Sequence, residues 1–213
     1  MRAQPHVRRA SRADVPALAR MLARAFLDDP VASWAWRPDR LRPKALERFQ
    51  RQRLLQLLAD DAVWTTAELD CAALWAAPGR WKTTLIQDAV FLPCFAHPRL
   101  ALRAPLVVAG WLDLERRHPT KPPHYYLAVL GTDPARQGRG LGSAALAPVL
   151  EQCDRDGVGA FLESSKERNV DFYARHGFRV TEEIRLLRGP KMWHMWREPP
   201  GHPRTFPEGG ESR

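Results

Sequence analysis

The sequence predicts an α/β (α+β) fold in which a mixed, mostly antiparallel sheet carries helices on both faces. Three observations lead to this prediction. The chain has 213 residues, 45% of them apolar, which suffices for one substantial core. Two short β-like runs, Ala62–Thr66 and Cys71–Ala76, follow each other as a hairpin. From His124 to Arg197 the apolar patterns then follow the order β-α-β-α-β-β.

The N-terminal segment combines a short strand with an amphipathic helix. We expect the strand over His6–Ala10 and the helix over Val15–Leu27, with apolar positions at three-to-four spacing. Ser11 and Asp14 have the spacing of a capping box in front of this helix. Asp28–Pro30 is expected to end it.

Further helices and strands are expected around the same core. A helix over Leu41–Ala59 would point arginines outward, Arg42 among them. Between Thr83 and His118 prolines interrupt a helical pattern, which predicts two or three helices over the core. The C-terminal elements are expected over His124–Thr132, Leu141–Asp156, Ala160–Ser164, Asn169–His176, Arg179–Leu187 and Lys191–Arg197.

Composition narrows the class of partner. The net charge of +9 favours anionic partners, but no helix-turn-helix, RNP-type or zinc-finger motif accompanies it, so we expect no nucleic acid. No run reaches the roughly 18 apolar residues of a membrane span. Cys71, Cys94 and Cys153 form no C-x-x-C pair, so neither a disulfide framework nor a metal site is expected, and a cytoplasmic location fits.

Residues 1–198 are expected to form one domain, and residues 199–213 a disordered tail.

A glycine-rich turn, Gln137–Ser143, stands between an apolar strand and an apolar helix. Its glycines let a ligand approach the main chain, and the helix N-terminus adds N–H donors, so the turn predicts an anion site. A P-loop needs Lys and then Ser or Thr after its last glycine, whereas Ser143 and Ala144 follow Gly142. A Rossmann turn needs two residues between its second and third glycines, where this chain has Leu141 alone.

Two motifs in this region resemble the GNAT superfamily of N-acetyltransferases. A Q-x-x-G-x-G pattern, Gln137–Gly142, follows a strand ending in Asp133–Pro134 and resembles the acyl-CoA signature of that superfamily. Further along, Asn169–Phe178 matches its N-x-x-F-Y-x-x-x-G-F element. The resemblance implies a single domain with a sheet splayed at the acyl-CoA site, and acetyl-CoA as the cosubstrate. It also implies cofactor contacts from Leu130, Gly131, Thr132, Arg136, Gln137, Gly138, Arg139, Gly140, Leu141, Gly142, Ser143, Asn169 and Phe172.

The segment Pro122–Arg197 is further similar to the puromycin N-acetyltransferases. That resemblance implies acetyl transfer to the primary amine of a small molecule, such as a puromycin-like aminonucleoside antibiotic, by direct attack on the thioester, with a role in antibiotic resistance. Transfer to a protein N-terminus or lysine, and a non-catalytic acyl-CoA-binding module, are the alternatives. A monomer or a homodimer is expected. The acceptor pocket is expected within Leu41–His118, where tryptophans either line it or belong to the core: Trp64, Trp75, Trp81 and Trp111.

Two residues are candidates for proton transfer. The resemblance places Tyr173 near the sulfur, where a phenol with an ordinary pKa of about 10 can protonate the leaving thiolate; a core tyrosine is the alternative. Glu163 is the candidate base, because a carboxylate in an apolar strand is costly to bury without a role or a partner. A pair with an arginine such as Arg168 is equally compatible. A water relay from Glu163 or from His124 would serve as well.

The remaining expectations concern how acetyl-CoA is held. Leu130 and Thr132 would exchange main-chain hydrogen bonds with pantetheine, and an N–H near Thr132 would hold the oxyanion if a bulge splays the strands there. Asn169 can cap a helix, bind pantetheine, or do both. Arg136 and Arg139 are either solvated loop residues or partners of the CoA phosphates.

Overall fold

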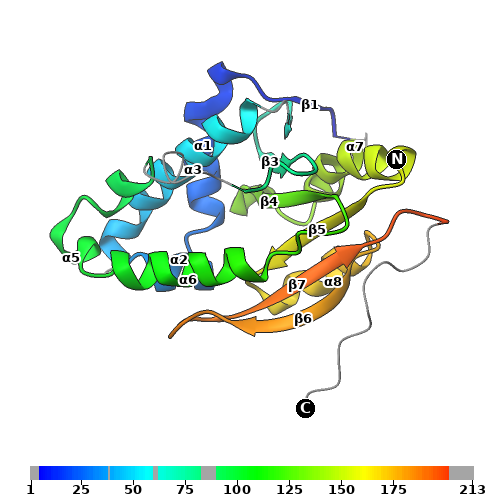
Figure 1. Cartoon of the computed structure of the whole chain (residues 1–213). Helices are drawn as coiled ribbons and strands as arrows, with labels where there is room; N and C mark the ends of the chain where they lie inside the picture. Colours follow the sequence, from blue (N-terminus) through cyan, green and yellow to red (C-terminus); the bar gives the residue numbers. More distant parts are fainter. Residues whose placement is uncertain (1–4, 38, 60–61, 83–89, 202–213) are drawn as a thin grey trace, which may run out of the picture.

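A seven-stranded sheet forms the centre of the described part of the chain, which comprises residues 5–37, 39–59, 62–82 and 90–201 of the computed structural model. The strands are β1 (Val7–Arg9), β2 (Val63–Thr66), β3 (Cys71–Ala76), β4 (His124–Thr132), β5 (Gly159–Ser164), β6 (Arg179–Arg185) and β7 (Lys191–Arg197). Their order in the sheet is β1-β2-β3-β4-β5-β7-β6 (Figure 1). Neighbouring strands are antiparallel except β4 and β5, which run parallel. The sheet is therefore mixed and mostly antiparallel, as predicted.

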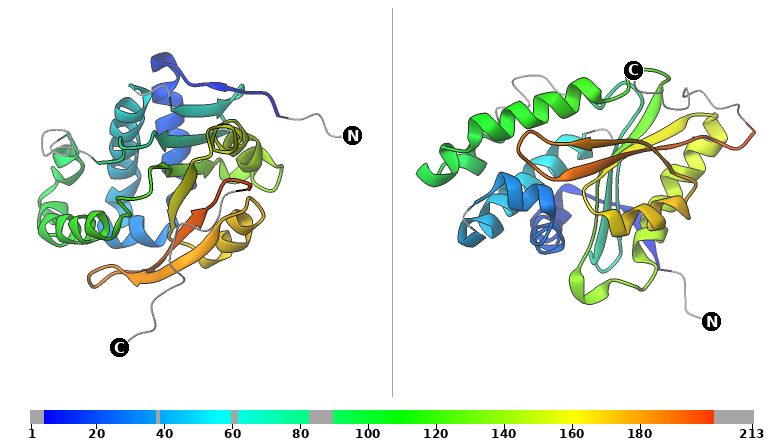
Figure 2. Two further views of the ribbon diagram at one scale, coloured as in Figure 1. Left: turned by 45° about the vertical axis from the view of Figure 1, so that its right-hand side comes forward. Right: turned by 90° about the horizontal axis from the view of Figure 1, so that it is seen from below.

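Helices cover both faces of the sheet (Figure 2). They are α1 (Val15–Ala25), α2 (Pro30–Ala35), α3 (Arg42–Leu58), α5 (Pro98–Ala101), α6 (Ala104–Arg117), α7 (Leu141–Asp156) and α8 (Val170–Ala174), with short 3-10 turns η1 (Arg12–Asp14), η2 (Asp39–Leu41), η3 (Leu92–Phe95), η4 (Pro134–Arg136) and η5 (Glu167–Asn169). One core holds α1 and α3 against the face of β3 that carries Leu74. A second holds α7 and α8 against the opposite face, which carries Trp75. The predicted α/β fold with helices on both faces is confirmed.

The first helix begins as its sequence predicts and ends differently. The Ser11 main-chain N–H and hydroxyl both donate to the Asp14 carboxylate, at 2.8 and 2.9 Å, so the expected capping box is present. The residues expected only to end this helix also start α2. Oδ1 of Asp29 accepts hydrogen bonds from the N–H groups of Val31 and Ala32, at 2.9 and 3.1 Å. The sequence prediction missed α2 because it treated an N-cap followed by proline as a stop signal alone.

Arg42 points inward, although the sequence predicted an outward position. Its residue surface is 8% exposed. The guanidinium donates to the main-chain oxygens of Leu27 and Trp36, at 2.9 and 3.3 Å. These oxygens lie just beyond α1 and at the end of α2, where carbonyl groups lack partners within the helix. The guanidinium of Arg42 can be buried here because these two oxygens accept its hydrogen bonds, and the oxygens in turn gain the donors that they lack within the helices.

The expected helical segment between residues 83 and 118 is described from residue 90 onward and consists of η3, α5 and α6. Pro93, Pro98 and Pro105 each stand in the first turn of one of these elements. Proline is tolerated there because the N–H it lacks would have no partner within the helix. Residues 83–89 and residues 202–213, most of the expected tail, lie outside the described residues.

Strands β4 and β5 pair over only part of their length. The parallel pairing runs from His124 opposite Gly159 to Leu127 opposite Leu162. Beyond that point β4 stays paired with β3 and β5 with β7. The two central strands therefore separate and leave a split in the middle of the sheet.

The bulge that accompanies this split lies at Ala128. Leu74 of β3 pairs with Val129, and the next residue, Trp75, pairs with Leu127, so Ala128 has no pairing partner on β3. The bulge is therefore not near Thr132, where the sequence predicts it, because Thr132 is regularly paired with Cys71. The hydrophobic pattern could not locate the bulge, because an extra residue in one strand becomes visible only against the register of its neighbour.

Candidate active site

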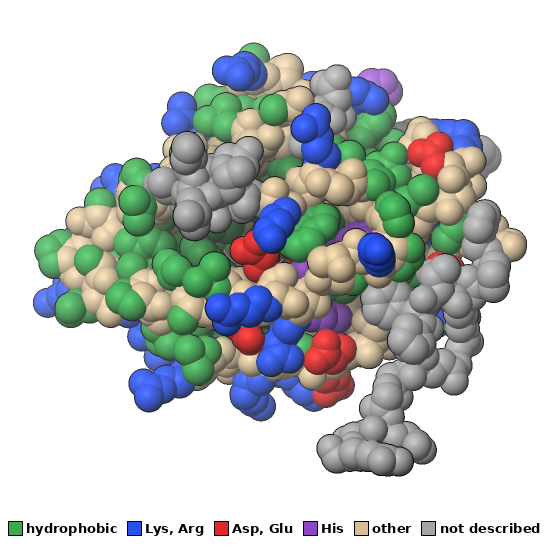
Figure 3. Space-filling model, in the orientation of Figure 1, with side chains coloured by type: hydrophobic (Ala, Val, Ile, Leu, Met, Phe, Trp, Pro, Cys, Tyr) green, Lys and Arg blue, Asp and Glu red, His purple; other side chains and the backbone are tan. Residues whose placement is uncertain are grey.

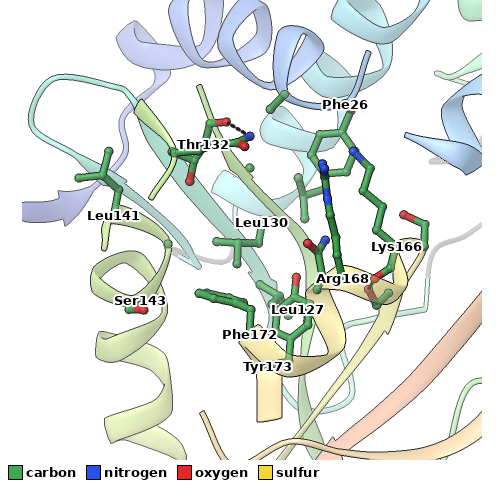
Figure 4. A pocket seen from close by; sticks show the side chains of 18 of the residues that line it. Phe26, Leu127, Leu130, Thr132, Leu141, Ser143, Lys166, Arg168, Phe172 and Tyr173 are labelled. Atoms are coloured by element: carbon green, nitrogen blue, oxygen red, sulfur yellow. Dashed lines mark hydrogen bonds between the residues drawn. The ribbon is translucent and has the colours of Figure 1, made fainter. Parts of the chain in front are cut away.

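A cavity of about 480 Å³ occupies the split between β4 and β5. Its lining combines β4, the turn after it, the end of β5, α8 and the α1–α2 connection (Figure 4). We call the part formed by Arg136 and the turn Gln137–Ser143 the glycine end. We call the part with the carboxylates of Asp29 and Glu163 and the phenol of Tyr173 the acidic end. All of these residues line the cavity except Arg139.

The glycine end offers mainly main-chain groups to the cavity. Gly138 and Gly140 have φ values of +74° and +79°, a left-handed region that other residues adopt only with strain. Gly140 is also the N-cap of α7, a helix of 16 residues. The first N–H groups of this helix have no partner within it and carry partial positive charge. The turn that the sequence predicts as an anion site thus lies at a helix N-terminus that opens on the cavity.

The edge of β4 that faces the split offers main-chain groups. The main-chain N–H of Asp133 donates to the main-chain oxygen of Asp70, in the loop between β2 and β3, at 2.8 Å. Because pairing alternates along an antiparallel ladder, Gly131 also bonds to β3, which leaves Leu130 and Thr132 facing the split. The Gln137 side-chain amide donates to Thr132 O at 3.3 Å. The two residues expected to contact pantetheine thus have their main-chain groups on the open side.

Basic side chains surround the cavity unevenly. Arg136 lines it while its Nε lies 3.3 Å from Asp70 Oδ2. Arg139, expected to reach a phosphate, is exposed and is not among the lining residues. The lining instead includes Lys166, Arg168 and Arg175, which the sequence analysis did not assign to the site. These three come from the segment between β5 and the C-cap of α8, so the folded chain supplies positive charge from a second direction.

Tyr173 and Asn169 belong to the short helix α8 and the turn before it. The ring of Tyr173 is buried, with 7% of the residue exposed, and Figure 4 shows it pointing into the cavity. Burial raises the pKa of Tyr173, and the negative charge of Asp29 raises it further, so the phenol keeps its proton well above neutral pH. Asn169 lines the cavity at the N-cap position of α8, but its side chain makes no capping hydrogen bond. Of its two expected roles, the capping one is absent.

Glu163 sits at the end of β5 with 6% of its side chain exposed. The hydroxyl of Tyr126 donates to its Oε2 at 2.7 Å, and Nδ1 of His118 lies 3.8 Å from its Oε1. The pairing with Arg168 considered from the sequence is not formed: Arg168 lies 3.6 Å from Asp28 instead. Burial and the Glu163 charge raise the pKa of Tyr126 well above its ordinary value, so it remains a hydrogen-bond donor.

Asp29 is the carboxylate that the sequence analysis missed. It is 4% exposed, lines the cavity, and accepts a short hydrogen bond from the Ser165 hydroxyl at its Oδ2. Because its other oxygen caps α2, the carboxylate is held between the α1–α2 connection and the residue that follows β5. The available signal was the pair of aspartates before Pro30, which resembles an ordinary helix boundary and carries no mark of a site.

The four tryptophans expected either to line the acceptor pocket or to belong to the core do not line this cavity. Trp75 is fully buried in the core, and Trp111 packs in a ring cluster with Trp36 and other aromatic residues. Trp64 stacks under Arg9 at 5.5 Å. Trp81 stacks on His118, with ring centroids 3.8 Å apart. Of the two roles left open for these tryptophans, lining this cavity is therefore not the one they have, and its aromatic side chains are Phe26, Phe172 and Tyr173.

The described residues include neither a membrane-spanning helix nor a metal-binding cluster. Among them, no helix has both the length and the apolar character needed to cross a membrane. Nor do they contain a group of three or more His, Cys, Asp or Glu side chains arranged to hold a metal ion. Cys71, Cys94 and Cys153 are buried free thiols, and burial raises the pKa of Cys71 to about 11.

Comparison with known proteins identifies the family. The profile described as "Acetyltransferase (GNAT) family" matches residues 61–178, more than half of the chain. The chain belongs to the GNAT acetyltransferase family. The match includes the split strands, the glycine turn and α8, and members of this family in general use acetyl-CoA.

Two individual relatives match this chain over only part of its length. The mycothiol acetyltransferase of Kineococcus radiotolerans is 32% identical over 141 residues, which cover 62% of this chain and 44% of that protein. An uncharacterized N-acetyltransferase of Schizosaccharomyces pombe is 33% identical over 64 residues, which cover 30% of this chain and 26% of that protein. The matched region therefore spans less than half the length of each of these relatives.

Solved structures show the same GNAT fold over nearly the whole chain. A crystal structure from Corynebacterium glutamicum, described as histone acetyltransferase HPA2 and related acetyltransferase, superposes with a TM-score of 0.66 at 24% identity, covering 93% of this chain and 98% of that one. Arylalkylamine N-acetyltransferase 2 of Aedes aegypti superposes with a TM-score of 0.58 at 14% identity, covering 91% and 98%. At these identities the likeness is one of fold.

Proposed function

We propose that this chain transfers the acetyl group of acetyl-CoA to the primary amine of a small molecule. One observation carries the proposal: a single cavity in the strand split joins a phosphate-suited glycine end to an acidic end with a protonated phenol and two carboxylates. An acyl carrier needs the first end, and proton transfer during acetylation of an amine needs the second. Both ends lie within the family match, apart from Asp29.

The glycine end and the strand edge would hold the donor. The N–H groups at the start of α7 suit the pyrophosphate of CoA, with Arg136 and Arg168 as charged partners. Pantetheine would extend along the open edge of β4, exchanging main-chain hydrogen bonds with Leu130 and Thr132, as an added strand does. Asn169, whose side chain is not used as a cap, would bind the pantetheine amides.

The acidic end would carry out the transfer. The amine nitrogen attacks the thioester carbon, the carbon–sulfur bond breaks, and the leaving thiolate takes the proton of the Tyr173 hydroxyl. Glu163 receives the proton that the ammonium form of the acceptor loses before the attack. The second proton that the nitrogen loses on becoming an amide returns to the Tyr173 phenolate, which gave its own proton to the thiolate. Main-chain N–H groups of β4 beyond the Ala128 bulge are suited to the oxyanion. Asp29 adds negative charge that attracts an ammonium group before it loses its proton.

A small acceptor is favoured over a basic peptide. The chain has a net charge of +9, and Figure 3 shows lysine and arginine side chains spread over several parts of the face in view. Such a surface repels lysine-rich segments while tolerating a small amine that enters the cavity. Among small acceptors we propose a puromycin-like aminonucleoside, supported by the likeness of Pro122–Arg197 to puromycin N-acetyltransferases. A relative named for mycothiol and a fold neighbour named for arylalkylamines support the wider class.

A thiol-release assay tests donor and acceptor together. Acetyl-CoA would be supplied with puromycin, an arylalkylamine, agmatine or a lysine-rich peptide, and CoA binding would be titrated in parallel. Turnover with a small amine supports the proposal, and puromycin as the best acceptor supports the aminonucleoside. Turnover with the peptide alone would overturn the small-molecule acceptor. CoA binding without turnover on any acceptor would point to a non-catalytic acyl-CoA-binding module.

A further inference from the structure

A row of ring nitrogens leads from Glu163 away from the cavity. Nδ1 of His118 lies 3.8 Å from Glu163 Oε1, and Nε2 of His118 lies 3.0 Å from Nε2 of His124. At the far end, Nδ1 of His124 lies 2.8 Å from the main-chain oxygen of Pro122. Both rings are buried, with 5% and 2% of these histidines exposed. Neither histidine lines the cavity, so Glu163 is the group that stands between these rings and a bound acceptor.

The hydrogen bonds decide where the protons are. A carbonyl oxygen only accepts, so Nδ1 of His124 carries a proton and donates to Pro122. Burial lowers the pKa of His124, which keeps this ring neutral and leaves its Nε2 as an acceptor. His118 must then donate from its own Nε2. With Nε2 of His118 in the donor role, the other ring nitrogen, Nδ1, is the one that faces the Glu163 carboxylate.

The geometry points to His118 as a positioning residue that takes over, from Glu163, the proton lost by the acceptor amine. This inference rests on the proposed acetyl transfer. An N–H bond of the ammonium form of the acceptor breaks and the proton binds the Glu163 carboxylate. It then passes to Nδ1 of His118, and Glu163 returns to the carboxylate form. The 3.8 Å distance between Glu163 Oε1 and His118 Nδ1 exceeds a hydrogen bond, so the proposed transfer requires that it shorten when the acceptor is bound.

The surroundings of His118 suit a ring that holds two protons. Its Nε2–H already has an acceptor in His124, and a new Nδ1–H would have one in Glu163. Trp81 lies face to face with the ring, with centroids 3.8 Å apart, and an indole face attracts a cation. Among the described residues, Tyr126 is in edge contact with the ring, and His194 interacts electrostatically with it. Arg53 in turn interacts with Tyr126.

Replacing His118 with glutamine separates this role from packing. In His118→Gln the amide nitrogen can still donate to His124, but no basic nitrogen faces Glu163. We expect kcat/KM for the best amine to fall about 100-fold near neutral pH. The loss should shrink at alkaline pH, where the amine already binds unprotonated. His97→Gln is the matched control, since His97 is exposed and caps α5 outside the cavity.

A second measurement does not depend on turnover. Long-range proton–nitrogen NMR spectra of histidine-labelled protein, assigned with the glutamine variants, report which ring nitrogen carries the proton. We expect Nε2–H on His118 and Nδ1–H on His124 at mildly alkaline pH. Nδ1–H on His118, or a His118→Gln variant with the wild-type rate and pH profile, would overturn the inference while wild-type turnover left the proposed function intact. A wild-type protein that acetylates no amine would overturn the proposed function, and proton uptake by His118 with it.

Discussion

The glycine end of the cavity is built from main-chain geometry in one contiguous stretch, whereas the acidic end gathers side chains that are far apart in the chain. Gly138 and Gly140 supply left-handed backbone, and α7 begins directly after them. Asp29, Glu163 and Tyr173, by contrast, come from the α1–α2 connection, β5 and α8. A binding surface for a common carrier can thus be local. The chemistry and the choice of acceptor depend on how distant elements pack.

The largest effect is expected at the acidic end, from Tyr173→Phe. Removing the phenol removes the proton donor for the thiolate, so kcat should fall roughly 100- to 1,000-fold while CoA affinity stays unchanged. Thiol release and a CoA titration measure the two quantities. Tyr125→Phe is the matched control, because the Tyr125 hydroxyl contacts Asp156 away from the cavity. A Tyr173→Phe variant with the full rate would take the proton-donor role from Tyr173.

A smaller effect at the same end is expected from Asp29→Asn. Asparagine also caps helices, so α2 should form and the thermal midpoint should change little. The lost negative charge should raise KM for a cationic amine about tenfold, with kcat nearly unchanged. Asp133→Asn makes the same change at the cap of η4 outside the cavity. If both variants raised KM equally, the acidic end would not be where the amine binds.

At the glycine end, Gly140→Ala should weaken CoA binding several-fold. A Cβ at Gly140 meets no atom within 4 Å, so the cost is backbone strain, on the order of 1–2 kcal/mol, at a φ of +79°. Gly79→Ala is a matched control, because Gly79 has a φ of +76°, also meets nothing within 4 Å, and lies outside the cavity. Both variants should lose similar stability in denaturant unfolding. Only Gly140→Ala should lose CoA affinity, and equal losses in both would contradict a local donor site.

The smallest effect expected is on stability as a function of pH. Burial lowers the pKa of His124 and of His194 from the ordinary value of 6.5. As the pH falls below that value, the unfolded chain binds protons that the folded chain does not, so the free energy of unfolding decreases. Above it both states are neutral at these rings and the contribution is constant. Urea unfolding at about pH 7.5 and about pH 5.5 measures the difference, and a midpoint that rises on acidification would contradict the buried neutral rings.

The sequence located the glycine end more fully than the acidic end, for a physical reason. The turn Gln137–Ser143 and the α8 motif with Tyr173 are local patterns, so their residue types and spacing were readable without a fold. Glu163 was found because a carboxylate interrupts an apolar strand. Asp29 and His118 carry no comparable local mark, and only the packing of α2 and α6 near β5 reveals them.

The same distinction explains the errors within the fold. The bulge was placed near Thr132 and lies at Ala128, because it depends on the register between two strands. Arg42 was expected outside and lies inside, because its partners are carbonyl oxygens at helix ends that are distant in the sequence. The main strands and helices were predictable because their apolar periodicity is local.

The most direct test of this account is a crystal structure of the protein with bound CoA. We predict the pyrophosphate at the N–H groups of the Gln137–Ser143 turn, pantetheine hydrogen-bonded to Leu130 and Thr132, and the sulfur within about 4 Å of the Tyr173 hydroxyl. CoA bound outside the split between β4 and β5, or with its sulfur directed away from Tyr173 and Glu163, would contradict the joining of the two ends into one active site.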